Sequence, residues 1–493
     1  MKKIYFLLIS LCLFTSVNAQ IINFPDANFK AKLLEASPSN NISQNLSVVN
    51  FKIDANNNGE IEVSEAEQVS ALQIPYSSII SLDGISNFSN LTYLDCSQNQ
   101  LSTLNLSNNS LLTDLQCYYN QLTSLNVSGN TSLENLNCYN NQLIYLSVSN
   151  NSLLKYLQCL NNQLTNLDLS NNTALIFLSC DQNQLYGLNL TNNTSLITLY
   201  CRNNQLTSLN LGNNTIVNTV KCDFNQLTSL NVNNNISLLE LNCSNNQLTN
   251  LDFSNNRYLY ALECSSNQLT SLDLSNNKEL SFLNCNFNQL NNLFIKNGLN
   301  EIWQDSNGNF TSVFLFENNL NLQYICADEN QISQIQNQIS VYGYTNCHVN
   351  SYCSFTPGGT FYTFQGNNKY DSNNNSCDAL DLPLSNLKFN ITDGTNSVSL
   401  ISNTSGSYSI PVQAGTHTIT PVFENPSYFA VSPTTVNVTF PTQTSPFTQN
   451  FCITANGVHP DLEVTLLPLE IARPGFDATY KIIYKNKGNT TQS

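Results

Sequence analysis

The chain has 493 residues, of which 10% are charged, and its 17 basic and 33 acidic residues give a formal net charge of −16. Such an acidic chain lacks the positive surface that attracts nucleic acid or an anionic membrane, so we expect no nucleic acid partner. The hydrophobic fraction of 41% is enough for a packed core and excludes wholesale disorder.

Residues 1–19 have the pattern of a secretory signal peptide. Lys2 and Lys3 precede an apolar run from Ile4 to Phe14, and Ala19 ends a small-residue cleavage site. The run is too short to span a bilayer, which needs about twenty apolar residues, and no later segment is apolar enough. The sequence therefore predicts a secreted, extracellular protein without a transmembrane segment.

Residues 20–68 form a predicted N-terminal cap, with a short amphipathic helix expected over Ala27 to Leu34. Within it, residues 54–65 fit the twelve-residue EF-hand loop D-x-[DN]-x-[DN]-G-x5-E. An acidic, Asn-rich turn that fits by composition alone is the alternative, but composition does not explain Ile61 or the terminal acid. We expect a structural calcium ion on Asp54, Asn56, Asn58, the Glu60 carbonyl, Glu62 through a water, and Glu65.

Residues 69–353 form the predicted solenoid, which opens with an atypical 22-residue unit, Val69 to Asn90, and then repeats at a constant length. Cysteines stand every 21 residues from Cys96 to Cys285, and Asn-Gln-Leu triplets follow in the same step. The unit that starts at Leu91 fits the leucine-rich pattern L-x-x-L-x-L-x-x-N-x-L with Cys96 in a leucine position. The predicted fold class is therefore mainly β, a leucine-rich-repeat solenoid of 21-residue coils.

Each coil is expected to bury one side of a short strand. Leu94 and Cys96 turn inward, whereas Tyr93 and Asp95 face solvent. Asn99 turns the chain, and its amide can bond backbone groups of neighbouring coils. A second column of asparagines, which begins at Asn109, closes each coil in the same way.

The cysteine column is interpreted as a stripe of buried small hydrophobic side chains. Cysteines on neighbouring parallel strands have Cβ atoms about 4.8 Å apart, whereas a disulfide needs about 3.8 Å. Cys326 lies in a further, degraded unit. The better disulfide candidates stand outside the ladder, and their three possible pairings stay open: Cys347, Cys353, Cys377 and Cys452.

The 21-residue period stops after Cys353. Short alternating strands between turns predict a β-sandwich over residues 354–458, and residues 459–493 read as the start of a truncated Ig-like domain. A second acidic turn, residues 371–378, lacks the glycine and the distal glutamate of a calcium loop, so calcium there is only an alternative.

The chain resembles secreted bacterial leucine-rich-repeat surface proteins of the type IX secretion, adhesin-like kind, with internalin-like repeats and a cysteine ladder. The resemblance rests on Phe24-Pro25-Asp26-Ala27-Asn28-Phe29-Lys30, the EF-hand-like loop, the Leu-x-Cys-x-x-Asn-Gln-Leu array and Ala472-Arg473-Pro474-Gly475-Phe476-Asp477. The sandwich is similar to B-type and prealbumin-like modules of bacterial adhesins. This kinship implies cell-surface display and adhesion, although such proteins generally end in a sorting domain that this sequence lacks.

No catalytic motif is present, and the three histidines lie far apart in sequence, so we expect no enzyme activity. Aromatic residues among amides on the outward strand positions suit a protein or polysaccharide ligand. The predicted ligand-binding surface comprises Tyr93, Tyr118, Tyr119, Tyr139, Tyr156, Phe177, Tyr200 and Phe224. Cross-coil stacking without a ligand is the alternative at these positions, and an exposed threonine column is a weaker candidate surface. The alternative function is a non-catalytic binding arm of a larger extracellular enzyme.

Overall fold

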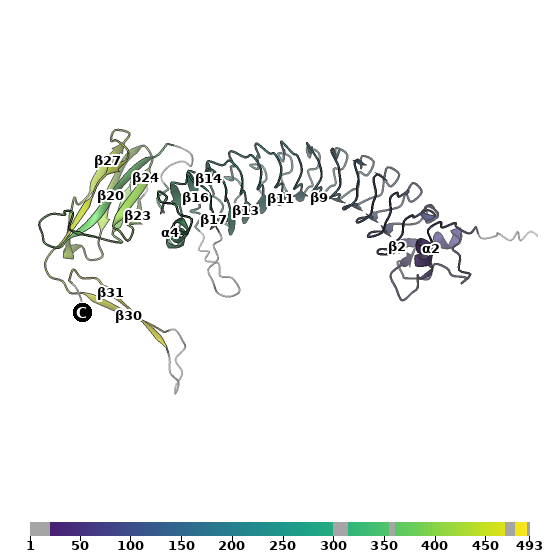
Figure 1. The fold of residues 1–493 in the computed structure, drawn as a ribbon, viewed down its shortest axis with the longest axis horizontal. Helices are drawn as coiled ribbons and strands as arrows, with labels where there is room; N and C mark the ends of the chain where they lie inside the picture. The colour runs from purple at the N-terminus through teal and green to yellow at the C-terminus, as the bar shows by residue number, and fades with distance from the viewer. Residues whose placement is uncertain (1–19, 299–313, 354–359, 396, 469–478, 491–493) are drawn as a thin grey trace, which may run out of the picture. The chain divides into compact units, whose positions relative to one another are not determined.

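The structure is a computed structural model that describes residues 20–298, 314–353, 360–395, 397–468 and 479–490 (Figure 1). The predicted signal peptide, residues 1–19, and the motif Ala472–Asp477 lie outside the described residues. The chain forms two compact units. The first holds the described residues up to 269 with 276–288 and 314–317, and the second holds 270–275, 289–298 and the described residues from 318 onward. No helix in the described ranges is long and apolar enough to cross a membrane.

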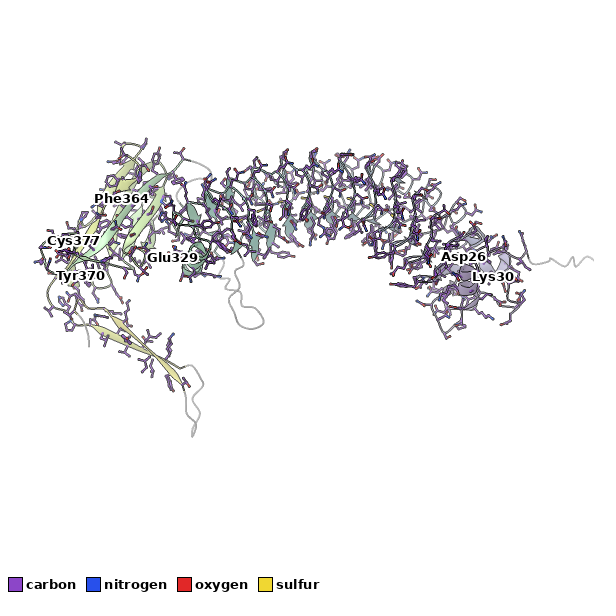
Figure 2. All side chains as sticks on the ribbon, viewed as in Figure 1. Asp26, Lys30, Glu329, Phe364, Tyr370 and Cys377 are labelled. Carbon is purple, nitrogen blue, oxygen red and sulfur yellow. A yellow bond between two sulfur atoms is a disulfide. The ribbon has the colours of Figure 1, made fainter. Side chains whose placement is uncertain are left out.

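The N-terminal cap begins with the predicted helix, α2 (Ala27–Leu34), which buries Phe29 and Leu33. Asp26 caps this helix and also ties it to the first coil, because its carboxylate accepts four backbone N–H groups at 2.6 to 3.0 Å, from Asn28, Phe29, Ile80 and Ser81. Burial opposes ionisation of this carboxyl, but the four hydrogen bonds outweigh it and lower the pKa of Asp26. Figure 2 shows Asp26 at the start of the helix, beside Lys30. The cap and the first coil also contain β1 (Ser43–Asn45), α3 (Val63–Ala66) and a 3-10 turn, η1 (Ile85–Asn87).

The first unit is organised around a 13-stranded sheet. Its first two strands pair antiparallel, and every later pair is parallel with a step of one coil (Figure 1). Leu199, for example, lies opposite Leu178 on one side and Val220 on the other. The strands after β1 are β2 (Val69–Gln73), β3 (Tyr93–Asp95), β4 (Asp114–Gln116), β6 (Asn135–Asn137), β8 (Tyr156–Gln158), β9 (Phe177–Ser179), β10 (Thr198–Tyr200), β11 (Thr219–Lys221), β12 (Glu240–Asn242), β13 (Ala261–Glu263), β15 (Phe282–Asn284) and β17 (Phe314–Leu315).

The interior of the array follows the repeat, and the predicted leucine-rich-repeat solenoid is confirmed. The ten ladder cysteines from Cys96 to Cys285 are fully buried and unbonded, as expected. A second, short row of strands closes part of the coils, with β5 (Leu125–Asn126) paired to β7 (Leu146–Ser147). Because the buried leucines and cysteines recur at fixed positions, adjacent coils pack identical surfaces against one another.

Two asparagine columns join each coil to the one before it. The Asn183 side chain donates to the carbonyl oxygens of Cys159 and Cys180, both at 3.1 Å, and its oxygen accepts the N–H of Leu164. In the second column, Asn172 donates to Val148 at 3.0 Å and to Asn151 at 2.8 Å. The first column therefore satisfies backbone groups of two coils, whereas the second column satisfies two carbonyls of the preceding coil. The side-chain oxygens of the second column from Asn109 to Asn256 accept no hydrogen bond from any described group, and nothing in the structure explains this.

The second unit contains a four-stranded sheet of β14 (Ser271–Asp273), β16 (Asn292–Phe294), β18 (Tyr324–Cys326) and β19 (His348–Asn350). Helix α4 (Ile332–Val341) precedes β19 and buries Ile335 and Ile339; we did not predict it. Cys326 is bonded to Cys353, so the expectation that the four cysteines outside the ladder pair among themselves is wrong for Cys353. Cys347 is buried and forms no disulfide, since Cys353 is bonded to Cys326 and Cys377 to Cys452.

The predicted sandwich strands are present in two sheets. One contains β20 (Tyr362–Asp371), β21 (Leu382–Pro383), β24 (Ser407–Val412), β26 (Phe429–Ser432), β28 (Phe447–Thr448) and β29 (Phe451–Ala455). The other contains β22 (Lys388–Thr392), β23 (Ser397–Ile401), β25 (Gly415–Val422) and β27 (Val436–Phe440), with a 3-10 turn, η2 (Pro426–Tyr428), before β26. Phe364, Phe389 and Phe451 are in the core, and Cys377 pairs with Cys452 (Figure 2). A hairpin of β30 (Leu462–Pro468) and β31 (Tyr480–Asn486) follows. The domain limits at 68/69, 353/354 and 458/459 stay predictions.

Candidate functional site

The outer face of the 13-stranded sheet carries all eight predicted ligand-binding residues, but they occupy four neighbouring columns. Tyr93, Tyr156 and Phe177 share the first strand position, and Tyr200 stands at the third. Tyr118 and Tyr139 follow the ladder cysteine, two positions beyond the end of the strand. Tyr119 and Phe224 come one residue later, at the turn before the conserved Asn-Gln-Leu triplet. The face is therefore a broad surface of aromatic residues.

Three tyrosines of the predicted surface contact one another. The rings of Tyr118 and Tyr139 stack with centroids 4.6 Å apart and planes 7° apart. Tyr119 meets Tyr139 edge-on at 5.3 Å. Tyr93 lies directly opposite Asp114 in the strand register, and burial, with the nearby charges of Asp95 and Asp114, raises its pKa to about 12. Tyr93 therefore remains protonated at neutral pH and can donate a hydrogen bond.

A second aromatic contact lies two coils further on. Phe177 meets Tyr200 edge-on at 5.5 Å. Two cations cover the Tyr200 ring, with the guanidinium of Arg202 at 5.7 Å and the ammonium of Lys221 at 5.6 Å from its centroid. Both are ion-paired across coils, Arg202 with Asp181 at 2.8 Å and Lys221 with Glu240 at 2.9 Å. Sequence reasoning missed these charged residues, although charges one coil apart in neighbouring columns could have revealed them.

Tyr119 and Phe224 have a backbone conformation that aromatic residues rarely adopt. Their φ angles are 51° and 54°, in the left-handed region, and Phe287 at the same position has φ 55°. In other coils this position holds residues such as Asn140 and Asn203, which tolerate that region better. The three aromatic side chains are 52 to 56% exposed, so core packing does not explain them. Tyr156 is also exposed, at 44%, and no described ring contacts it.

The EF-hand-like loop of the cap has the turn geometry that its motif requires. Asp54 accepts the N–H groups of Asn58 and Gly59, and Gly59 is left-handed with φ 77°. The side-chain amides of Asn56 and Asn58 both donate to the carboxylate of Glu62, at 3.2 and 2.7 Å.

The last loop residue, Glu65, accepts backbone N–H groups of Ala55 at 2.8 Å and of Glu62 at 3.1 Å. A hydrogen bond from Glu65 lowers the pKa of Glu62, and burial, with that contact, raises the pKa of Glu65. Glu60 forms an ion pair with Lys30 at 2.7 Å. Among the described residues no group of three His, Cys, Asp or Glu side chains has the arrangement of a metal site. The oxygen-rich donor set of the loop is nevertheless the kind that calcium takes.

The ladder thiols are buried in the core, and His417 and His459 pack against tyrosine side chains. Burial raises the pKa of every ladder thiol, that of Cys138 and Cys285 to about 12, so reactive thiolates do not form at neutral pH. His417 is buried against the Tyr352 hydroxyl at 3.1 Å, and the His459 ring stacks on Tyr428.

The chain is similar to solved leucine-rich-repeat structures. The functional domain of InlJ from Listeria monocytogenes, described as including a cysteine ladder, is 26% identical over 88% of this chain and 98% of that one, with a TM-score of 0.51. The internalin InlF of the same species is 23% identical over 69% of this chain and 100% of that chain, with a TM-score of 0.49. A leucine-rich-repeat protein of Leptospira interrogans is 24% identical over 58% and 74% of the two chains, with a TM-score of 0.46. No protein-family model and no curated protein matches the chain.

Proposed function

We propose that the outer face of the 13-stranded sheet binds a protein or polysaccharide ligand, and that the protein is a secreted, non-catalytic adhesin displayed at the cell surface. The observation that carries this proposal is the placement of Tyr119, Phe224 and Phe287. Each occupies a left-handed backbone position, which costs a residue with a Cβ atom about 1 kcal/mol, and each leaves about half of its ring in solvent. Neither the backbone conformation nor core packing favours an aromatic residue at these three positions, and a role in ligand binding would account for it.

The test uses the left-handed position itself. In a Tyr119→Asn, Phe224→Asn and Phe287→Asn variant, each position receives the residue that other coils already use there. We expect this variant to fold at least as stably as the parent and to lose retention on immobilised glycans and host or matrix proteins. A Tyr145→Asn and Tyr186→Asn variant, which removes exposed rings elsewhere on the coil, is the control. Retention that is equal for all three proteins, or absent for the parent, refutes the proposal.

Secretion is part of this proposal and rests on the pattern of residues 1–19; export by a type IX system rests on the resemblance alone. The alternative is a binding arm of a larger extracellular enzyme. The two are separated by sequencing the complete gene: a hydrolase signature beyond Ser493 favours the enzyme, and a sorting domain alone favours the adhesin.

Calcium binding by the cap loop is a separate proposal. The residues that would hold the ion are Asp54, Asn56, Asn58, the Glu60 carbonyl, Glu62 and Glu65. Bound calcium would neutralise the loop acids and fasten the cap. Calorimetric titration of the protein and its Glu65→Ala form with calcium tests it, with Glu67→Ala as a charge-matched control. Equal heats for the protein and the Glu65→Ala form contradict the assignment.

A further inference from the structure

Three consecutive coils near the N-terminal end of the array, from β3 to β6, carry a compact group of aromatic and acidic side chains on the outer face. We name it the tyrosine–aspartate patch, and it comprises Tyr93, Asp95, Asp114, Tyr118, Tyr119 and Tyr139. The stacked pair Tyr118 and Tyr139 lies on one side, and Tyr93 lies beside Asp114 in the register. In the register Asp95 lies opposite Gln116, two positions along the strand from the Tyr93–Asp114 pair, so both carboxylates stand on the same face of neighbouring strands. The patch therefore combines ring surface with negative charge.

The two carboxylates of the patch have no basic partner. Asp95 accepts hydrogen bonds only from the backbone N–H and hydroxyl of Ser97, and Asp114 accepts one from Gln116. Within the described ranges, no Lys or Arg lies at ion-pair distance from either carboxylate. Residues 53–154 contain nine acidic residues and no Lys or Arg at all. The part of the chain that carries the patch is therefore acidic, and the carboxylates of Asp95 and Asp114 are not neutralised by a neighbouring base.

A second group of rings and carboxylates on the same face, around Tyr200, is complemented by basic side chains of the chain itself. At Tyr200 the chain supplies its own cations: Arg202 and Lys221 lie over the ring while their charges pair with Asp181 and Glu240. Cations over aromatic rings are stabilised by the ring quadrupole, and a nearby carboxylate adds charge pairing. The patch has the rings and the carboxylates but lacks the cations.

We propose that the tyrosine–aspartate patch binds Arg or Lys side chains of a protein ligand. This inference rests on the proposed binding function of the face and narrows it to a basic protein segment. A neutral polysaccharide would use the ring surface but would gain nothing from two unpaired carboxylates. The electrostatic part of this attraction also steers a basic partner toward the N-terminal end of the array.

The test measures binding of a fluorescein-labelled (Gly-Arg)4 peptide to the whole protein by fluorescence polarisation at about 50 mM salt, where exposed charges are weakly screened. The neutral peptide (Gly-Gln)4 and chitohexaose serve as the other probes. We expect the arginine peptide to bind more tightly than either. An Asp95→Asn and Asp114→Asn variant should bind it about tenfold more weakly, since two exposed charge pairs and their contribution over the rings are lost.

The matched control is an Asp168→Asn and Asp252→Asn variant. Both residues are exposed, lie in the second half of their coils, and accept a backbone N–H two residues on, as Asp95 does. The control changes net charge equally, so it should bind the arginine peptide within about twofold of the parent. Equal weakening in both variants would mean that net charge alone attracts the peptide and overturns the inference. Tighter binding of chitohexaose than of the arginine peptide overturns it in favour of a glycan. In either case, if the protein is still retained on an immobilised glycan or on a host or matrix protein, the broader proposal that the face binds a ligand is unaffected.

Discussion

Alkaline pH should unfold the array through its buried thiols. In the folded protein burial raises the pKa of all ten ladder cysteines, whereas in the unfolded chain they ionise near the ordinary value of 9.0. The unfolded state therefore releases protons first, and the free energy of unfolding falls as pH rises above 9 and up to the folded pKa values. The folded array is stabilised fully only below that window.

The magnitude follows from the number of thiols. For a group that ionises only in the unfolded chain, raising the pH from 9 to 10 lowers the free energy of unfolding by about 1 kcal/mol. Ten ladder thiols together lower it by about 10 kcal/mol, which is comparable to the whole stability of a typical domain. The tyrosines with raised pKa values, such as Tyr93 at about 12, act in the same direction but mainly above pH 10.

The assay is guanidinium unfolding followed by circular dichroism at pH 7, 8, 9 and 10 under anaerobic conditions. A Cys159→Ala, Cys180→Ala and Cys201→Ala variant is the comparison, because the pH-dependent difference within one protein cancels the cost of the substitutions themselves. Between pH 9 and 10 we expect the free energy of unfolding of the variant to fall by about 3 kcal/mol less than that of the parent. An unfolding midpoint that does not move between pH 8 and 10, or an equal loss in the variant, would falsify the account of the ladder as uncharged core.

Three further predictions concern a buried asparagine, the capping aspartate of the first helix and the disulfide of the sandwich. Asn172→Ala should lower the free energy of unfolding by about 2 kcal/mol, because two buried carbonyls lose their hydrogen-bond donor. Asn171→Ala, at the neighbouring exposed position, should lower it by well under about 1 kcal/mol. Chemical denaturation compares the two variants, and equal losses of stability contradict the role of the buried asparagine column. Asp26→Ala should cost about 2 kcal/mol and also remove stability that the parent loses below about pH 4, as its carboxylate becomes protonated, which unfolding at pH 3 and 7 measures. The double variant Cys377→Ser and Cys452→Ser should lower the melting temperature of the sandwich and cost about 4 kcal/mol, since the disulfide closes a loop with a sequence separation of 75 residues; a melting temperature unchanged from the parent contradicts this.

The array could be predicted from the sequence because all its coils share one pattern of buried and exposed positions. The period places leucine and cysteine inside at every turn, and the helix at Ala27–Leu34 was visible from its capping Asp26. The cysteine pairing could not be predicted, because Cys326 meets Cys353 through an approach of segments that no local pattern encodes. Helix α4 was missed although Ile332, Ile335 and Ile339 have helical spacing.

The site was predictable as a set of exposed aromatic residues but not as contacts. Spacing alone placed Tyr118 and Tyr139 on the outer face, yet their stacking depends on side-chain orientation beyond a strand of three residues. The left-handed backbone at Tyr119 has its sequence signal in other coils, where asparagines such as Asn140 and Asn203 hold the same position, so it is visible only when the coils are compared. The calcium loop is a clear motif, and whether it holds an ion is a matter for titration.

Between β3 and β15 the step between paired strands is 21 residues throughout, so the length of this part of the array can change only by that increment. Deleting residues 176–196 would join Leu175 to Ile197, which reproduces the junction already present at Leu196, so every rung on either side would keep its partner. Deleting one residue fewer would reverse inside and outside along the next strand. Gain or loss of whole repeats can thus lengthen or shorten the proposed binding face while the pattern of buried residues stays the same.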